Sequence, residues 1–308
     1  MKGRLALCSQ TTLVKFRMHV LEVALNVLHE PVGDEKVRLT LEAFDLHAKG
    51  DLEYPQSASS RSEPVPDYPA RDASLKFVHP SRAPRRGKGG TLESRKAILH
   101  ALTHIECTAV DLAWDIIARF GQHEEYADVL PKEFYEDFLV VAADEARHYT
   151  ALRARLEDLG GRYGDLDVHE GLWDSARRTK DRLEARLAVE HALHEARGLD
   201  VLPGTIERFK RGGDAETARL LEEVILPEEV GHCAAGVKWI KWLKQESGRE
   251  KYAGRVWAED AKTFDSVEDW FHSLVRGNFD GVLKPPFNTA AREAAGFTPA
   301  WYLPLAEV

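Results

Sequence analysis

Apolar residues recur every three or four positions along most of the chain, and strict alternation of apolar and polar residues is missing. Glycine pairs such as Gly160-Gly161 and Gly212-Gly213 separate the periodic stretches, as expected where helices end. The pattern predicts helices at residues 11–29, 34–48, 92–120, 131–159, 172–199, 215–244, 249–264 and 266–279. We therefore expect an all-α protein in which the four long helices form a bundle.

The segment from residue 51 to residue 91 interrupts this pattern. It holds prolines at 55, 64, 66, 69, 80 and 84, a serine-rich run at 57–60 and a basic cluster at 82–88. Such a composition predicts an extended arm. The basic cluster fits contact with an anion or a nucleic acid, or pairing with acidic helices, and we favour the pairing. The arm then wraps its own bundle or, in a homodimer, a neighbouring one.

One domain of residues 1–308 accommodates all these segments. Accessory helices are expected at 1–50, the arm at 51–91, the four-helix bundle at 92–247, and further helices with a tail at 248–308. The tail is rich in aromatic residues and too apolar to stay solvated. We therefore expect it to pack against the bundle as a lid.

Two short sequences carry the candidate chemistry. Asp144-Glu145-Ala146-Arg147-His148 and Glu228-Glu229-Val230-Gly231-His232 each place a His three residues after a Glu. Side chains three residues apart on a helix share a face, so each Glu-x-x-His pair can hold one metal ion. A single pair of this kind is common on solvated helices. Its repetition in two predicted helices is what indicates a metal site.

The other two long helices each offer one glutamate, Glu106 and Glu195, on a periodic apolar face. A ferritin-like di-metal bundle uses one Glu from each of two helices and a Glu-x-x-His pair from each of the other two. The predicted ligands are Glu106, Glu145, His148, Glu195, Glu229 and His232. Four carboxylates neutralise and bridge two ions, and two imidazoles complete the coordination while leaving positions open for oxygen.

Oxygen and nitrogen donors favour iron, with manganese as the alternative. Zinc fits the same ligands but supplies no redox chemistry. We therefore expect two metal ions as cofactors, either two irons or an iron and a manganese.

Acidic residues precede both ligand glutamates. Asp144 and Glu228 occupy equivalent positions, where each carboxylate can accept a proton from the metal-bound His of the opposite hairpin. Glu228 can also replace Glu229 as the ligand, because its spacing to the following His shares a face too. His191 lies four residues before Glu195, where it can be a seventh ligand, line the cavity or be a satisfied core histidine. We favour the core histidine.

Other residues near the motifs are interpreted structurally. His104 stands two positions before Glu106 in a helix, so both side chains cannot face one ion. Tyr149 points away from the metal for a similar reason and is interpreted as packing. Pro227 and Gly231 predict a kink or bulge in the fourth long helix, which opens coordination space.

Composition narrows the classes of protein that fit. The net charge of -9 argues against a surface made for nucleic acid, and no apolar stretch is long enough to cross a bilayer. Cys8, Cys107 and Cys233 are too scattered for a disulfide framework, and we interpret the last two as small buried residues rather than ligands. The apolar run after Met1 is too short for a signal peptide. We expect a soluble, cytoplasmic protein.

The chain resembles an uncharacterised bacterial family of the ferritin-like superfamily. The likeness rests on residues 104–106, 144–149, 163–165, 169–173, 195–200, 228–232, 285–288 and 290–297. More distantly, the site is similar to those of carboxylate-bridged di-iron oxygenases, rubrerythrins and di-iron tRNA hydroxylases. Those resemblances imply oxygen or peroxide chemistry, with electrons supplied by a separate protein. Unlike rubrerythrin, the chain lacks a rubredoxin-like cysteine knuckle.

The function we expect is that of an oxidoreductase whose di-iron or iron–manganese centre activates oxygen. It would oxidise or hydroxylate a small organic substrate under the tail. Two alternatives stay open at this point. One is iron oxidation or peroxide detoxification without an organic substrate, and the other is a non-enzymatic helical interaction protein with buried polar networks.

Overall fold

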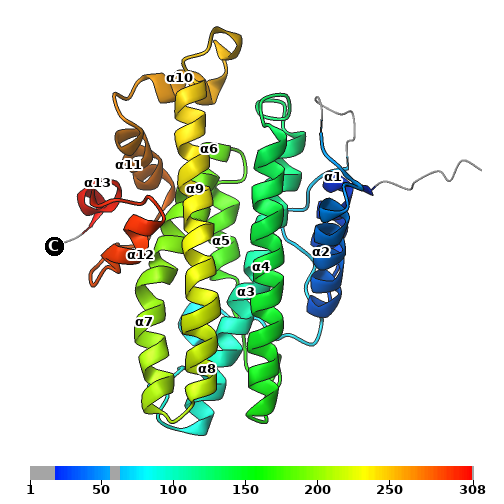
Figure 1. Cartoon of the computed structure of the whole chain (residues 1–308), viewed down its shortest axis with the longest axis vertical. Coiled ribbons are helices and arrows are strands. Elements are labelled where there is room, and N and C mark those ends of the chain that lie inside the picture. The colour runs from blue at the N-terminus through cyan, green and yellow to red at the C-terminus, as the bar shows by residue number, and fades with distance from the viewer. Residues whose placement is uncertain (1–17, 56–62, 307–308) are drawn as a thin grey trace, which may run out of the picture.

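The computed structural model describes residues 18–55 and 63–306, and this part of the chain is mostly helical (Figure 1). The all-α class expected from the apolar spacing is confirmed. Short strands β1 (Met18–His19) and β2 (Leu52–Glu53) pair in parallel beside the first helices. Within the described ranges, no helix combines the length and the apolar character that crossing a membrane requires.

The first half of the chain contains two short helices and one long hairpin. The helices are α1 (Val20–His29), α2 (Gly33–Ala48), α3 (Leu92–Gln122) and α4 (Lys132–Asp158). Helices α3 and α4 pack along their length, and α2 covers α4 on the side away from α9 (Figure 1). The observed first helix is shorter than the one predicted at residues 11–29. It begins at Val20, because His19 caps it and Met18–His19 form β1. Residues 11–17 lie outside the described residues.

The second half forms another long hairpin, and short π-helical turns interrupt both of its arms. One arm consists of α6 (Leu183–Ala188), the π turn η2 (Val189–His194) and α7 (Glu195–Arg211). The other consists of α8 (Ala215–Leu220), the π turn η3 (Leu221–Ile225) and α9 (Leu226–Glu246). Smaller elements follow, namely η4 (Glu250–Tyr252), α10 (Val256–Lys262), α11 (Val267–Asn278), α12 (Thr289–Ala294), α13 (Pro299–Tyr302) and η5 (Leu303–Leu305).

The helix predicted at 172–199 is wrong at both of its ends. Helix α5 (Gly171–Arg178) stops early, and a turn separates it from α6. The buried guanidinium of Arg186 stabilises this turn by donating to Thr179 Oγ1 and to the carbonyl of Ala176. Apolar spacing continues through the turn, so the pattern alone gives no sign of it.

At its other end this helix continues past Pro203 to Arg211. A proline lacks the N–H that would bond the carbonyl four residues earlier, which here belongs to Leu199. The side chain of Asn288 donates to that carbonyl at 3.1 Å. The tail thus replaces the missing helical hydrogen bond, and α7 extends one hairpin arm to the end of the bundle.

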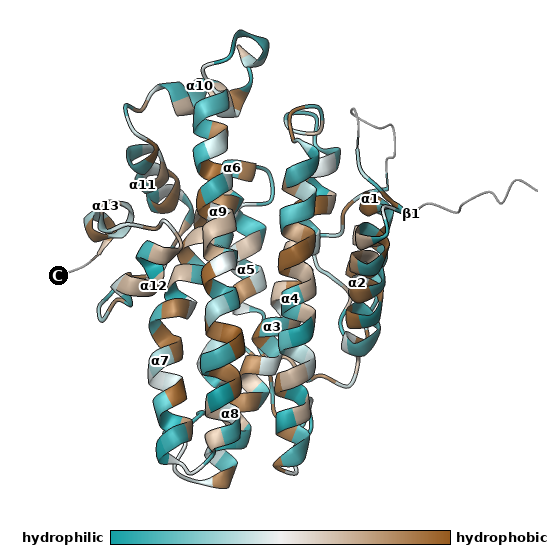
Figure 2. Ribbon diagram, in the orientation of Figure 1, coloured by the Kyte–Doolittle hydropathy of each residue, from teal (hydrophilic) through white to brown (hydrophobic). Residues whose placement is uncertain are grey.

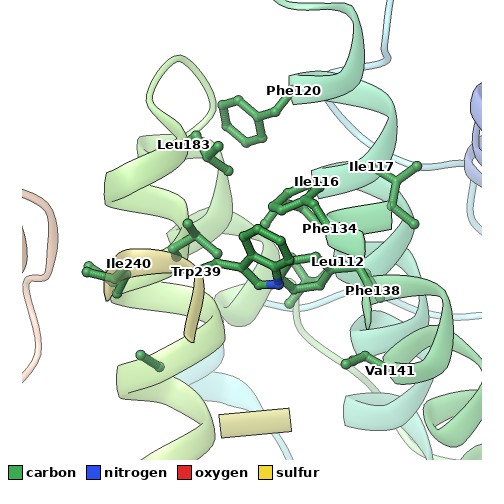
Figure 3. Packing of buried hydrophobic residues seen from close by; sticks show 14 of the residues in the cluster. Leu112, Ile116, Ile117, Phe120, Phe134, Phe138, Val141, Leu183, Trp239 and Ile240 are labelled. Carbon is green, nitrogen blue, oxygen red and sulfur yellow. The ribbon is translucent and has the colours of Figure 1, made fainter. Parts of the chain in front are cut away.

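Two apolar clusters fill the interior on either side of a polar layer. The larger lies around Trp239, which Figure 3 shows among Leu112, Ile116, Phe134 and Phe138. The smaller lies at the other end and includes Ile98, Leu99, Leu152, Leu156, Leu202, Ile206 and Phe209. Apolar and polar colours alternate along the long helices in Figure 2, as expected when each turns one face inward. The carboxylates and histidines of the predicted metal site occupy the intervening layer.

The arm and the tail both pack on this chain. Arg71 of the arm forms ion pairs with Asp111 of α3 and with Glu170. In the tail, Arg292 is fully buried against the rings of Phe287, Phe297 and Tyr302 and pairs with Asp200 of α7. The basic cluster at 82–88 does not behave as expected. Its cations form no ion pair with any described residue, so its assignment to acidic helices is wrong.

Candidate metal centre

Four helical segments bring all six predicted ligands into one buried layer. Ligand atoms of Glu106, Glu145, His148 and Glu229 lie within 4.8 Å of one another. A second group meets the same limit and consists of Glu145, Glu195, Glu229 and His232. Glu145 and Glu229 belong to both groups. The arrangement therefore has the form of two adjacent cation positions that share two carboxylates and take one imidazole each.

Helical spacing accounts for the pairs within each motif. His148 Nδ1 lies 3.5 Å from Glu145, and His232 Nδ1 lies 3.6 Å from Glu229. The motifs also cross, because His148 Nδ1 is 3.5 Å from Glu229 and His232 Nδ1 is 3.0 Å from Glu145. Each imidazole therefore turns its Nδ1 atom toward carboxylates from both hairpins.

Buried atoms at the centre of this layer have no hydrogen-bond partner among the described residues. They are Nδ1 of His148, Nδ1 of His232 and Oε2 of Glu145. Leaving such atoms unpaired in a protein interior is costly, and native structures rarely do so without an ion, a water or a functional reason. These donors fit a metal ion, because one unpaired nitrogen belongs to each donor group and Glu145, which carries the unpaired oxygen, belongs to both.

Outer carboxylates hold the other nitrogen of each imidazole. His148 Nε2 lies 2.7 Å from Glu228 in α9, and His232 Nε2 lies 3.3 Å from Asp144 in α4. This is the crossed pairing that the sequence predicts. An Nε2–H that donates to a carboxylate leaves the Nδ1 lone pair free for a metal, so these contacts select the tautomer a ligand needs. Glu228 is therefore engaged with His148, which leaves Glu229 as the inner carboxylate.

The electrostatics of the metal-free layer depend on shared protons. Burial and the charge of Glu145 raise the pKa of Glu106, and burial and Glu229 raise the pKa of Glu195. Burial acts in the same direction on Glu145, but the imidazoles of His232 and His148 hold its pKa well below the usual range. Protonated carboxyls and imidazoliums thus balance the ionised carboxylates until cations replace those protons.

The imidazoles show the opposite shift. Burial favours their neutral form, but attraction to the surrounding carboxylates, which lie 3.0–3.7 Å from the Nδ1 atoms, outweighs it. The pKa of His148 is raised by Glu106, Glu145 and Glu229, and that of His232 by Glu145 and by Asp144. Without metal, both rings therefore carry a proton that a metal ion has to displace.

His191 lies outside both donor groups. It is 3% exposed, and its ring packs edge-on against Phe138 with centroids 4.9 Å apart. Burial and the nearby Arg186 lower its pKa to about 3, so the ring is neutral. Its Nε2 atom has no partner among the described residues. His191 is therefore buried in the core, but it is not the fully hydrogen-bonded core histidine that we favour from the sequence, because Nε2 is left without a partner.

The other candidates near the motifs also face away from the centre. His104 Nδ1 lies 2.7 Å from the hydroxyl of Tyr163, and its Nε2 lies 3.2 Å from the carbonyl of His169. Tyr149 packs edge-on against Tyr163. Burial raises the pKa of Cys107 to about 11, so this thiol stays protonated. Neither Cys107 nor Cys233 belongs to a donor group.

The two π turns lie immediately before the ligands of the second hairpin. The turn η2 ends at His194, next to Glu195, and η3 ends two residues before Pro227. The bulge predicted near Pro227 is thus present just upstream, whereas η2 was not foreseen. The feature that accompanies η2 is a contact between distant parts of the chain, which the sequence pattern does not reveal. A Cβ on Gly236 would lie 1.9 Å from the carbonyl oxygen of His191, so α9 and η2 touch through their backbones.

Buried ion pairs around the layer were not foreseen either. Lys36 is 2% exposed and pairs with Asp111, which follows Glu106 by five residues on α3. Further along α3, Asp115 pairs with the buried Arg186. These acids occupy inward positions of a helix, but their partners come from distant segments. Their spacing alone therefore does not separate them from metal ligands.

Comparison with other proteins identifies a family without assigning a reaction. Residues 29–303 match the family described as "Protein of unknown function (DUF455)". A protein of Haemophilus influenzae named "Uncharacterized protein" is 32% identical over 272 residues, which cover 86% of this chain and 85% of that protein. No solved structure matches the chain.

Proposed function

This chain belongs to the DUF455 family, and we propose that it is a di-metal oxidoreductase with a ferritin-like four-helix bundle. Its two metal ions are iron, or iron and manganese. With dioxygen and electrons from a separate donor, the centre oxidises or hydroxylates a small organic substrate.

The observation that carries the proposal is the overlap of the two donor groups. Glu145 and Glu229 belong to both, and each group adds one imidazole and one further glutamate. A purely structural polar network has no need for two nearly equivalent clusters, and it would pair the Nδ1 atoms that remain unpaired here. Two bound ferrous ions would supply the electrons and open coordination positions that dioxygen requires.

The residues of the chain have distinct roles in this proposal. Glu145 and Glu229, which belong to both donor groups, would help to hold both ions, and Glu106 and Glu195 would each help to hold one. His148 and His232 ligate through Nδ1, while Glu228 and Asp144 hold their Nε2–H groups. The apolar clusters on both sides of the layer restrict water, which strengthens each electrostatic contact within it.

The donor set supports redox-active metals. Four carboxylates and two imidazoles suit iron and manganese, whereas zinc sites of structural type use mainly cysteine and histidine. Both thiols nearest the layer lie outside the donor groups. Supplying iron and manganese together and measuring which ion the full chain retains would distinguish the two metals.

An anaerobic titration with ferrous ion, followed by addition of air, tests the proposal. We expect an end point of two irons per chain and uptake of oxygen after aeration. Glu145→Gln removes a charge from both positions, so it should lose most of the iron and nearly all oxygen uptake. Glu133→Gln changes an exposed glutamate at the start of the same helix and should behave as the parent protein.

Other outcomes would redirect the assignment. A chain that stays free of metal after expression with ample iron is a structural or partner-binding bundle. Uptake of many irons per chain into a mineral would indicate iron storage. If Glu145→Gln retains two irons and the parental oxygen uptake, the bridging role of Glu145 is wrong.

A further inference from the structure

A second candidate site lies on the opposite side of α3 from the metal ligands. Its cavity has a volume of about 50 Å³ and lies between the arm, the loop at residues 166–172 and α3. Small and aliphatic side chains make up much of its wall, namely Ala83, Pro84, Ala97, Ala101, Ile105 and Leu172. His104 also lines it, two residues before Glu106, so the cavity and the metal ligands occupy different faces of the helix.

One cation at this cavity has no counter-charge. Arg86 lines the cavity and forms no ion pair within the described part of the chain. Arg86 is an exposed residue at the mouth of the cavity, so solvent also reaches it, and partial burial together with the nearby Arg208 lowers its pKa. Asp167 also lines the cavity, but it pairs with Lys76 at 2.9 Å. The cavity therefore has an excess of positive charge.

The loop that carries Arg86 is held in place. Ser94 Oγ donates to the carbonyl of Arg86 at 2.7 Å and accepts from the N–H of Gly89 at 2.7 Å. Gly87 has a φ of +67°, and a Cβ on it would lie 2.5 Å from Ser94 Oγ, so this position requires glycine. The guanidinium is thus attached to a positioned loop at the start of α3.

The cavity between α2 and α4 provides a contrast. It is larger, at about 160 Å³, and three cations line it. Each of these has an acidic partner, because Lys36 and Arg71 pair with Asp111 and Arg153 pairs with Asp34. Positive charge is balanced there. An unpaired cation beside an apolar cavity occurs at Arg86, where Arg82, Arg85 and Lys88 of the basic cluster add further unpaired charge.

We propose that the cavity beside Arg86 binds a small amphipathic anion, a carboxylate or phosphate group on a short apolar chain. The guanidinium takes the anionic head, because its donors match both oxyanions in a bidentate geometry. The apolar chain lies against Ala97, Ala101 and Ile105. A cavity of this volume holds roughly three or four heavy atoms, given that about 10–15 Å³ of such volume holds one water.

Calorimetric titration of the full-length protein tests this site with defined probes. Butyrate and butyl phosphate carry both parts of the ligand, inorganic phosphate lacks the apolar part, and 1-butanol lacks the charge. We expect one of the first two to bind at one site per chain. The other three probes should bind on the order of tenfold more weakly or not at all. The comparison of butyrate with butyl phosphate identifies the head group.

Three variants separate this site from general surface charge. Arg86→Gln should weaken binding by on the order of tenfold, because it removes a charge-assisted contact. Arg82→Gln removes an exposed charge that does not line the cavity and should have little effect. Ala101→Phe fills the cavity and should abolish binding, and Ala97→Leu is a milder filling variant if that protein is unstable. An unchanged far-UV circular dichroism spectrum and urea midpoint in each variant show that the bundle is intact.

Several results would overturn the proposal. One is the absence of saturable binding by any probe. Another is an equal loss of binding in Arg86→Gln and Arg82→Gln, which would indicate a diffuse basic surface. A third is tight binding of a single-stranded oligonucleotide that weakens equally for each cation removed from residues 82–88. That result would assign the basic cluster to a nucleic acid instead.

Discussion

The two hairpins of the candidate metal centre supply the same donors but are built differently. In the first hairpin, α3 and α4 run as uninterrupted α-helices past Glu106, Glu145 and His148. In the second, π turns lie just upstream of Glu195 and of the Glu229 motif. Within the described residues, one half of the layer is thus regular, and the other is locally widened by π turns, which hold more residues per turn than an α-helix.

The regular half is also the more deeply buried. Glu145 is 1% exposed and Glu106 is 5% exposed, whereas Glu195 is only partly buried. The chain's α2 and arm cover the first hairpin, and the tail is anchored on the second through Asp200. The difference indicates that the first hairpin acts as a scaffold, while local backbone adjustments in the second bring its ligands into position.

The largest effect should come from breaking the contact that accommodates η2. Gly236→Ala places a Cβ 1.9 Å from the carbonyl oxygen of His191, and both nearest atoms are backbone. Either η2 or α9 has to move, at a cost of about 3 kcal/mol. We expect a lower urea midpoint and, if the proposed function is right, weaker metal binding by the donor group that includes Glu195.

The matched control lies on the same helix. Gly231→Ala adds a Cβ that meets no atom within 4 Å, although Gly231 is closer to the ligands in sequence. It should retain the parental metal content and gain about 0.5–1 kcal/mol in the free energy of unfolding, because alanine favours a helix interior. Equal behaviour of the two variants would contradict the idea that α9 and η2 need backbone contact.

The same contrast explains what could be predicted from the sequence. Glu-x-x-His spacing is a property of one helical turn, so Glu145 with His148 and Glu229 with His232 follow from local geometry. The turn before α6 depends on Arg186, and the continuation of α7 past Pro203 depends on Asn288. Those partners are distant in sequence. The π turn η2 likewise depends on Gly236, so no periodicity within its own helix foretells it.

The basic cluster of the arm illustrates a second limit. Its charge is visible in the sequence, and pairing with acidic helices was a reasonable expectation for a chain with a net charge of -9. Acids that reach the arm instead pair with Arg71 and Lys76, which lie outside the cluster. Which cation receives a counter-charge depends on the path of the arm, and composition does not encode that path.

Glu228 and Asp144, the outer carboxylates, each contact the imidazole of the opposite hairpin, so their removal tests the two imidazoles separately. Glu228→Gln weakens the partner of His148, and Asp144→Asn weakens the partner of His232. We expect each to lower metal affinity by about 10- to 100-fold. Glu228 should have the larger effect, because its contact is 2.7 Å against 3.3 Å for Asp144. Competition titrations with a chelator at both variants measure the difference.

A larger loss in Asp144→Asn would reverse this ranking. It would mean that the His232 position dominates binding, so the deformable hairpin would hold the tighter ion. Glu133→Gln on α4 controls for the general effect of removing a negative charge.

The pH dependence of metal binding tests what both hairpins share. Raised pKa values keep His148 and His232 protonated without metal, and those of Glu106 and Glu195 are raised as well. Metal binds only the deprotonated ligands, so binding releases protons and tightens as pH rises. Each proton released changes affinity by about tenfold per pH unit.

Calorimetric titrations in buffers of different ionisation enthalpy count the released protons directly. Measurements between about pH 6 and pH 8 avoid the range in which exposed carboxylates titrate. Affinity that stays constant across this range, with no proton release, would show that the layer is already ionised and that its charges are balanced in another way.

The smallest expected effect is a gain in stability from a substitution in α7, whereas Gly236→Ala should lower stability. Gly198 follows Glu195 by three residues, and a Cβ on it meets no atom within 4 Å. Gly198→Ala should raise the free energy of unfolding by about 0.5–1 kcal/mol, because alanine favours a helix interior. A urea titration measures the gain. Unchanged metal content would show that the second hairpin is sensitive to substitution at the contact of η2 with α9 and not at Gly198. A loss of metal would instead show that all of this helix must stay adjustable around Glu195.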